Sequence, residues 1–220
     1  MTTRILSLSG GGIRGIFQAV YLREIAAQFK KPLRTYFDVI AGTSTGAIIA
    51  LGVALNIDLK RIVSLFEDHG GEIFPQDVRR ASKRMHTWGF TGPRYKQEPL
   101  QRILNEVFQA NGKQLQIRDC EPSVIIAAAN LDRYKMRSFT MLDRSGAPPD
   151  IESRDGELFA ADVALASAAA PLFFPAVRPK GRTKKGVGNG GAHVCRWRGV
   201  GEQPLIAGRV GCARSLEDTF

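Results

Sequence analysis

The sequence lacks the features of a membrane-spanning, secreted or disulfide-bonded protein. No run of about 18 apolar residues is present, and residues 1–7 lead into a strand-like pattern without the apolar core of a signal peptide. The three cysteines, Cys120, Cys195 and Cys212, do not have metal-ligand spacing and cannot all pair within one chain. We therefore expect a protein of the reducing cytoplasm.

Histidine is equally scarce, with only His69, His86 and His193 in the chain. A Ser-His-Asp hydrolase needs a histidine as general base. His69 ends a predicted helix, His86 lies in a basic loop, and His193 lies in the C-terminal tail, so none of them stands in a supporting motif. This scarcity of histidine disfavours a Ser-His-Asp triad. If such a triad exists, His193 is the remaining candidate for its histidine.

Acidic residues are also under-represented. Lys and Arg outnumber Asp and Glu by 31 to 21, which gives a net charge of +10. Much of this excess lies in residues 178–220, which are also rich in glycine. The length of 220 residues and the 44% hydrophobic content predict one globular core, which we place at residues 1–178.

Hydrophobic periodicity predicts alternating strands and helices. Strands are expected at 4–9, 36–41, 124–129 and 136–141. Helices are expected at 16–29, 45–55, 59–68, 99–108 and 158–169, with the third stopped by Gly70-Gly71 and the first carrying an apolar stripe of Ile16, Val20, Ile25 and Phe29. Strand–helix–strand order implies parallel strands joined by right-handed crossovers, and so an α/β sandwich. Residues 74–96 are basic and aromatic, and form either a solvated loop, which we favour, or a lipid contact.

The central motif is Gly42-Thr43-Ser44-Thr45-Gly46, which follows an apolar strand and opens an apolar helix. This is the layout of a nucleophile elbow, in which a serine sits on a strained strand-to-helix turn. Glycine at positions 42 and 46 leaves room for the close approach that such a turn requires. Ser44 is therefore our candidate nucleophile.

A second glycine motif, Gly10-Gly11-Gly12-Ile13-Arg14-Gly15, follows the first strand. Consecutive glycines allow backbone N–H groups to converge at a helix N-terminus, where negative charge is favoured. This loop therefore suits an oxyanion hole. It also fits the dinucleotide-binding fingerprint, but no acid for a ribose lies about 20 residues further on. We therefore disfavour the dinucleotide alternative.

Three segments together resemble the patatin-like phospholipase family. They are Leu-Ser-Gly-Gly-Gly-Ile-Arg-Gly at 8–15, Phe-Asp-Val-Ile-Ala-Gly-Thr-Ser-Thr-Gly at 37–46, and Ala-Ser-Ala-Ala-Ala-Pro-Leu-Phe-Phe-Pro at 166–175. The resemblance implies a three-layer α/β/α fold, hydrolysis of phospholipids or other acyl lipids, no metal or other cofactor, and a Ser–Asp dyad. It also implies peripheral contact with membranes and no nucleic-acid partner. Carried over by residue, Ser44 is the nucleophile, and Gly10, Gly11, Gly12 and Arg14 frame the oxyanion hole.

The aspartate that the resemblance implies is missing. The family places it in an Asp-Gly-Gly or Asp-Gly-Ala motif shortly after the Pro-x-x-Phe-Pro segment, whereas this chain has Asn189-Gly190-Gly191. An amide cannot accept the serine proton as a carboxylate does. Three other aspartates are weak candidates for a substitute base: Asp155, Asp162, which we expect on a helix surface, and Asp218.

A shift of reading frame offers an explanation for the missing aspartate. One synonymous coding of residues 194–204, read one nucleotide later, gives Tyr-Ala-Asp-Gly-Gly-Val-Trp-Ala-Asn-Asn-Pro, which resembles the family's segment. The Asp codon would straddle Arg196 and Trp197. On this hypothesis residues 179–220 are largely out of frame and poorly ordered, and the chain ends early with impaired activity. Two alternatives stay open, namely a basic tail for anionic lipid or nucleic acid, and a non-catalytic lipid- or protein-binding module on the same scaffold.

Sequencing the gene tests the frameshift hypothesis. We expect the true codons of residues 194–204 to encode an Asp-Gly-Gly segment after a shift of one nucleotide. If no such shift restores that segment, the basic-tail interpretation replaces it.

Overall fold

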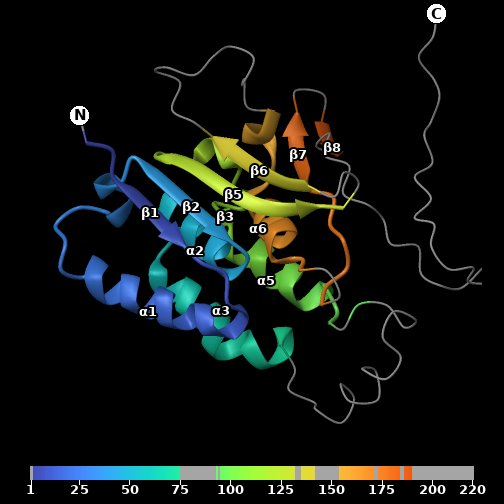
Figure 1. The fold of residues 1–220 in the computed structure, drawn as a ribbon, viewed down its shortest axis with the longest axis horizontal. Helices are drawn as coiled ribbons and strands as arrows, with labels where there is room; N and C mark the ends of the chain where they lie inside the picture. Colours follow the sequence, from blue (N-terminus) through green and yellow to red (C-terminus); the bar gives the residue numbers. More distant parts are fainter. Residues whose placement is uncertain are drawn as a thin grey trace, which may run out of the picture.

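The computed structural model of the protein describes residues 2–74, 93, 95–131, 135–141, 154–170, 173–183 and 186–189. Its centre is a four-stranded sheet with the order β1-β2-β5-β6 (Figure 1). Strands β1 (Ile5–Leu8), β2 (Val39–Thr43) and β5 (Ser123–Asn130) are parallel, and β6 (Lys135–Met141) is antiparallel to β5. The carboxyl ends of β1 and β2 therefore lie side by side, and both glycine motifs follow them.

Five α-helices accompany this sheet in the described part of the chain. They are α1 (Gly15–Ala26), α2 (Thr45–Ala54), α3 (Leu59–Ile73), α5 (Glu98–Val107) and α6 (Ala160–Ala168). Helices α2 and α6 contact the strands directly, and α1, α3 and α5 pack around them (Figure 1). The predicted α/β class with a mainly parallel sheet is confirmed. The described helices form one layer, and the second helix layer of the expected three-layer sandwich is not among the described elements.

Short elements complete the description. They are the pairs β3 (Gln109–Ala110) with β4 (Lys113–Gln114) and β7 (Lys180–Thr183) with β8 (Gly186–Asn189), and the 3-10 helices Gly12–Arg14, Leu33–Tyr36, Ile117–Asp119 and Arg154–Glu157. The hairpin β7–β8 places two strands beyond residue 178, where we had drawn the domain boundary. Its first strand also bridges to the core at Leu158.

Helix α2 is the hub of the core because every one of its residues is buried. Its sequence is apolar on all sides, which is typical of a helix enclosed by other elements. The elbow is therefore attached to the most deeply buried helix described. A turn anchored in this way is held in position by the packing of the whole domain.

Helix α3 continues past Gly70-Gly71, where we expected it to end. Asp58 is the N-cap, and its side chain accepts a hydrogen bond from the Lys60 N–H at 2.9 Å. The helix itself runs from Leu59 to Ile73. Two glycines in a helix cost about 1 kcal/mol each relative to alanine. Burial of Phe66 and Ile73 on one stripe outweighs that cost. Gly70 lies on the same stripe, where the Ile13 side chain packs against it.

Three other boundaries differ from the sequence prediction. The segment Leu33–Tyr36 forms a 3-10 helix after Pro32, so β2 begins only at Val39. The two residues before Ala160 form bridges instead of helix, so α6 is shorter than expected. In α1 the predicted stripe is confirmed in part, because Ile16, Val20 and Ile25 are half-buried against the core. Phe29 is exposed, and the most deeply buried positions are Gly15, Ala19 and Leu22. Small side chains there let the helices approach closely.

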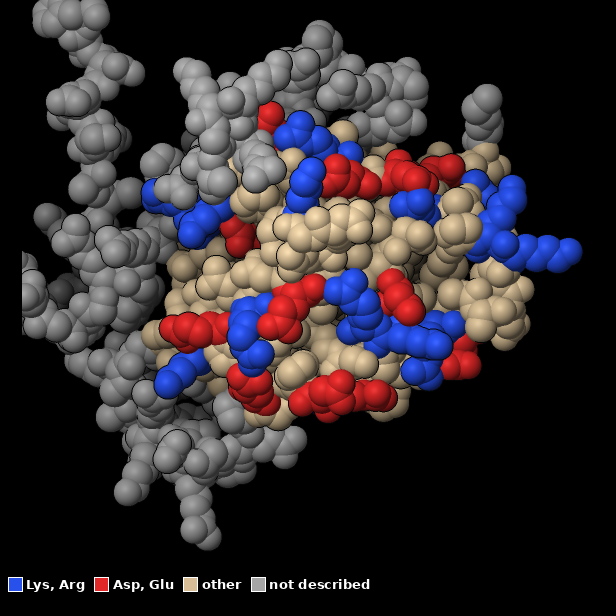
Figure 2. Space-filling view, turned by 180° about the vertical axis from the view of Figure 1, so that it is seen from behind, with Lys and Arg blue, Asp and Glu red and all other residues tan. Residues whose placement is uncertain are grey.

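The surface seen in Figure 2 carries both signs of charge. Lys and Arg side chains alternate with Asp and Glu across the described part of this face. Binding of nucleic acid depends on a basic surface that neutralises phosphates. The described residues on this face do not form such a surface.

Asp162 was expected on a helix surface, and this expectation was wrong. The side chain is buried, with 7% of its surface exposed, and its Oδ2 accepts a hydrogen bond from the Lys180 N–H at 2.7 Å. Burial raises the pKa of this carboxyl, while the Lys180 amide and ammonium partly oppose the shift. Asp162 therefore fastens β7 to α6.

Replacement of Asp162 tests this link. Asp162→Ala leaves the Lys180 N–H without its acceptor, and we expect a loss of about 1–3 kcal/mol in the free energy of unfolding. Asp162→Asn keeps an acceptor oxygen and removes the buried charge. The pKa of the Asp162 carboxyl is higher in the folded protein than in the unfolded chain. The wild type therefore loses stability as the pH rises from the unfolded-state pKa to the folded-state pKa. Urea titrations should therefore favour Asp162→Asn over the wild type increasingly as the pH rises above about 4, the unfolded-state pKa of an aspartate. An asparagine variant as unstable as the alanine variant would contradict the assignment.

Candidate active site

Ser44 occupies the turn between β2 and α2. Its backbone has φ 53° and ψ −125°, a conformation that non-glycine residues rarely adopt. Such a conformation costs about 1–3 kcal/mol and persists only where the surroundings enforce it. The strain predicted for a nucleophile elbow is therefore present at Ser44.

Two close approaches enforce this turn. A Cβ atom at Gly42 would lie 2.8 Å from the Ala47 Cα, and one at Gly46 would lie 2.6 Å from the Leu8 carbonyl carbon. Both contacts involve backbone, which cannot move aside as a flexible side chain does. Positions 42 and 46 therefore have no room for any side chain, and β1 rests directly on the first turn of α2.

Ser167 is a third support, and the sequence analysis gave it no role. The Ser44 N–H donates to the Ser167 Oγ at 2.8 Å, and the Ser167 hydroxyl donates to the Ala127 carbonyl at 2.6 Å. This chain of bonds ties the elbow to α6 and β5. In the sequence, the signal that could have indicated this role is a single hydroxyl residue among the alanines of segment 166–170.

The glycine loop lies directly against the elbow. A Cβ atom at Gly10 would lie 2.9 Å from the Ser44 Cβ. The Gly10 N–H donates to the Thr43 Oγ1, and the Gly11 N–H donates to the Thr45 Oγ1, each at 3.1 Å. We had expected consecutive loop N–H groups to converge on one open point. Instead, the first two are engaged by the threonines beside Ser44.

An apolar cavity of about 530 Å³ opens beside Ser44. The glycine loop and Arg14 form one wall, and aliphatic and aromatic side chains form the rest. Those side chains include Ile48, Leu65, Phe66, Phe74, Tyr95, Leu100, Phe173 and Phe174. Phe74, Tyr95 and Phe174 pack edge-on or tilted against one another, with ring centroids 5.4 to 6.2 Å apart. The cavity has the size and apolar lining of a small-molecule pocket.

A second cavity of about 520 Å³ also borders Ser44. It is more open, and its lining includes Thr43, Ser167, Asn130, Lys135 and Met136. Alanine and leucine side chains make up most of the rest of this lining, so Ser44 borders two mainly apolar cavities that differ in how open they are.

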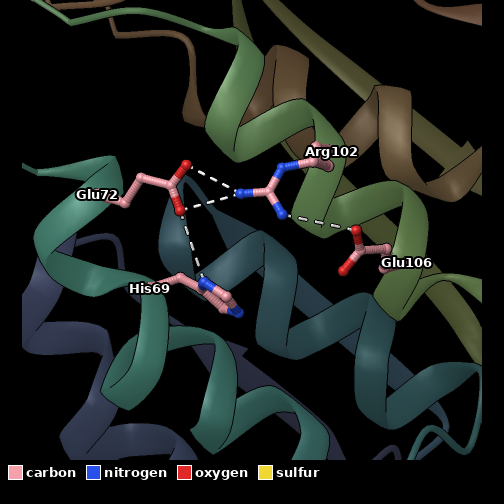
Figure 3. Close-up of polar contacts among 4 residues, drawn as sticks. All are labelled: His69, Glu72, Arg102 and Glu106. Atoms are coloured by element: carbon pink, nitrogen blue, oxygen red, sulfur yellow. Dashed lines mark hydrogen bonds and ion pairs between the residues drawn. The ribbon is translucent and has the colours of Figure 1, made fainter.

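No acid or histidine lines either cavity among the described residues. Asp155 is held by the Arg137 guanidinium at 2.6 Å, and Asp162 is held by Lys180. His69 lies on α3, where its Nδ1 is 3.6 Å from Glu72 Oε2. Glu72 in turn meets Arg102, which also contacts Glu106 (Figure 3). This is a surface network between α3 and α5, so His69 does not serve Ser44.

The remaining candidates lie outside the described residues. They are His86, His193, Asp218, the Arg196/Trp197 position and most of the basic segment 74–96.

Comparison with known proteins decides the family. A family model described as patatin-like phospholipase matches residues 6–192. The chain belongs to the patatin-like phospholipase family. The resemblance carried by the two glycine motifs and the segment 166–175 is thereby confirmed.

Several patatin-like relatives are bacterial. The cGAMP-activated phospholipase of Pseudomonas aeruginosa is 34% identical over 177 residues, covering 80% of this chain and 50% of that protein. The cGAMP-activated phospholipase of Escherichia coli is 35% identical over 178 residues, covering 78% and 47%. Patatin group D-2 of Solanum tuberosum is 29% identical over 185 residues, covering 78% and 43%. The chain thus spans about half the length of these patatin-like relatives.

The elbow contact predicts different effects for two glycine substitutions. In Gly46→Ala the new Cβ meets the Leu8 backbone, so we expect a loss of about 1–3 kcal/mol in the free energy of unfolding. Gly71→Ala adds a Cβ in open space on α3 and should gain up to about 1 kcal/mol. Urea unfolding measures both. Equal effects of the two substitutions would show that the elbow tolerates a side chain at position 46.

Proposed function

We propose that this chain is a serine-dependent lipid acyl hydrolase in which Ser44 attacks the ester carbonyl. The observation that carries this proposal is the placement of Ser44. Its strained turn abuts both the glycine loop and the mouth of a large apolar cavity. Family membership supports the same reaction class.

The reaction would proceed through an acyl-enzyme. The Ser44 Oγ gives up its proton to a base and bonds to the acyl carbon, and the resulting oxyanion accepts hydrogen bonds from backbone N–H groups. The carbon–oxygen bond to the alcohol then breaks, and the alcohol leaves with a proton. Water attacks the acyl-serine in the second half, which releases the fatty acid and restores the serine.

The apolar cavity would hold the acyl chain. Its aliphatic and aromatic lining carries no charge apart from Arg14 beside the glycine loop. The more open groove on the Lys135 side would then take the alcohol portion, including an anionic headgroup. We infer phospholipids or other acyl lipids as the substrate class.

We also propose that the protein works at a membrane surface from the cytoplasmic side. Ile13 and Phe173 line the cavity and are 40% and 43% exposed, and Phe17 on α1 is 76% exposed. Apolar side chains at a pocket mouth favour contact with lipid. Within the described residues, no helix is long and apolar enough to cross a bilayer.

The general base is the part of the mechanism for which the described residues offer no candidate. We propose a Ser–Asp dyad whose aspartate is supplied in the intact reading frame, so that the chain as given is slow. Lack of a base costs about 10²–10⁴-fold in rate. The same lack favours a second candidate, a non-catalytic lipid- or protein-binding module that uses the apolar cavity.

Labelling with a fluorophosphonate probe separates the two candidates, because the probe requires an activated serine. Because the described residues supply no base, we expect slow but detectable labelling at Ser44 that disappears in Ser44→Ala, and slow hydrolysis of short-chain p-nitrophenyl esters with the same dependence. A folded protein that remains unlabelled supports the binding module. Turnover that persists in Ser44→Ala would refute the role of this serine.

A further inference from the structure

We propose that Thr43 and Thr45 are positioning residues that hold the glycine loop through their hydroxyls and leave the N–H groups of Gly12 and Ile13 as the loop's oxyanion donors. This inference rests on the proposed function for its catalytic meaning. The two threonines flank Ser44, so one three-residue segment would carry the nucleophile and fix the loop that stabilises the charge.

The two hydrogen bonds form a matched pair. Gly10 bonds to Thr43 and Gly11 to Thr45, so consecutive loop amides reach side chains on either side of the nucleophile, both at 3.1 Å. Glycine loses more conformational freedom on ordering than any other residue. A run of three glycines therefore needs external contacts to hold one conformation, and these hydroxyls supply two.

The remaining amides of the loop have different partners. The Arg14 N–H donates to the Gly11 carbonyl at 3.2 Å, and the Gly15 N–H bonds within the 3-10 turn. Within the described residues, the Gly12 and Ile13 N–H groups donate to no protein acceptor. Both residues line the cavity together with Ser44. They are therefore available to an oxyanion, unlike the Gly10 and Gly11 amides that the sequence suggested.

The two threonines differ in a way that helps the test. Thr45 is buried with 2% exposure, and a Cβ at Gly15 would lie 2.9 Å from the Thr45 Cβ, so this side chain also packs. Thr43 is exposed. Valine matches threonine in shape without the hydroxyl, and serine keeps the hydroxyl without the methyl. Thr35, whose hydroxyl donates to the Pro32 carbonyl at 2.8 Å in the 33–36 turn, is a control outside the site.

The first measurement is amide hydrogen exchange by NMR, which does not depend on activity. We expect protected Gly10 and Gly11 amides in the wild type. Thr43→Val should speed exchange at Gly10, and Thr45→Val at Gly11, each by about fivefold, since a net hydrogen bond contributes about 1 kcal/mol. The serine variants and Thr35→Val should leave both amides protected. Unprotected amides in the wild type, or protection that survives valine, would overturn the proposal.

The second measurement is the rate of fluorophosphonate labelling at Ser44 as a function of probe concentration. We expect the maximal labelling rate to fall about tenfold to a hundredfold in Thr43→Val, because a displaced loop misplaces the oxyanion donors. The probe concentration for half-maximal rate should stay within about twofold, since the cavity is intact. Thr43→Ser should restore the rate, and Thr35→Val should not change it.

The outcomes distinguish failure of the positioning role of the threonines from failure of the proposed hydrolase function. If Thr43→Val speeds hydrogen exchange at the Gly10 amide but leaves the labelling rate unchanged, the positioning role is refuted. A serine variant as slow as the valine variant assigns the effect to the methyl group and also refutes it. If Thr45→Val fails to fold, Thr43→Val still decides. If the wild type shows no labelling at Ser44, the proposed function fails, and the exchange data alone decide whether the hydroxyls hold the loop.

Discussion

The structure depends on one backbone contact, where the end of β1 rests on the first turn of α2. Gly46 makes this contact possible because the Leu8 carbonyl occupies the space of a side chain. Parallel pairing of β1 with β2 places their carboxyl ends side by side, and each strand continues into a glycine motif. The loop at residues 10–15 and the turn at Ser44 are therefore brought together by sheet topology before any side chain contributes.

Side-chain hydroxyls then fix what the topology brings together. Thr43 and Thr45 engage the loop, and Ser167 engages the Ser44 amide while it bonds to β5. Each bond is modest in net free energy. Their shared effect is geometric, because they surround a residue whose backbone conformation is unfavourable. The fully buried helix α2 resists the relaxation that would release this strain.

The sequence predicted those parts that depend on local rules. The order of strands and helices and the elbow at Ser44 follow from periodicity and from glycine spacing. Contacts between distant segments were not predictable in this way. Helix α3 passes through Gly70 because Ile13 packs there, and Asp162 is buried because β7 reaches its carboxylate. The role of Ser167 depends on a partner more than a hundred residues away, which no local pattern reports.

In the proposed reaction, positioning and activation of Ser44 are separate physical tasks, and the described core provides for the first. The residues that position Ser44 lie on or next to β1, β2, α2, α6 and β5, all within the described core. Activation needs a proton acceptor, and the carboxylates of the described core are committed to ion pairs or backbone amides instead. The N-terminus of α2 lowers the energy of negative charge near Ser44 through its dipole. A dipole stabilises an alkoxide or an oxyanion but accepts no proton, so precise placement alone leaves the serine a weak nucleophile.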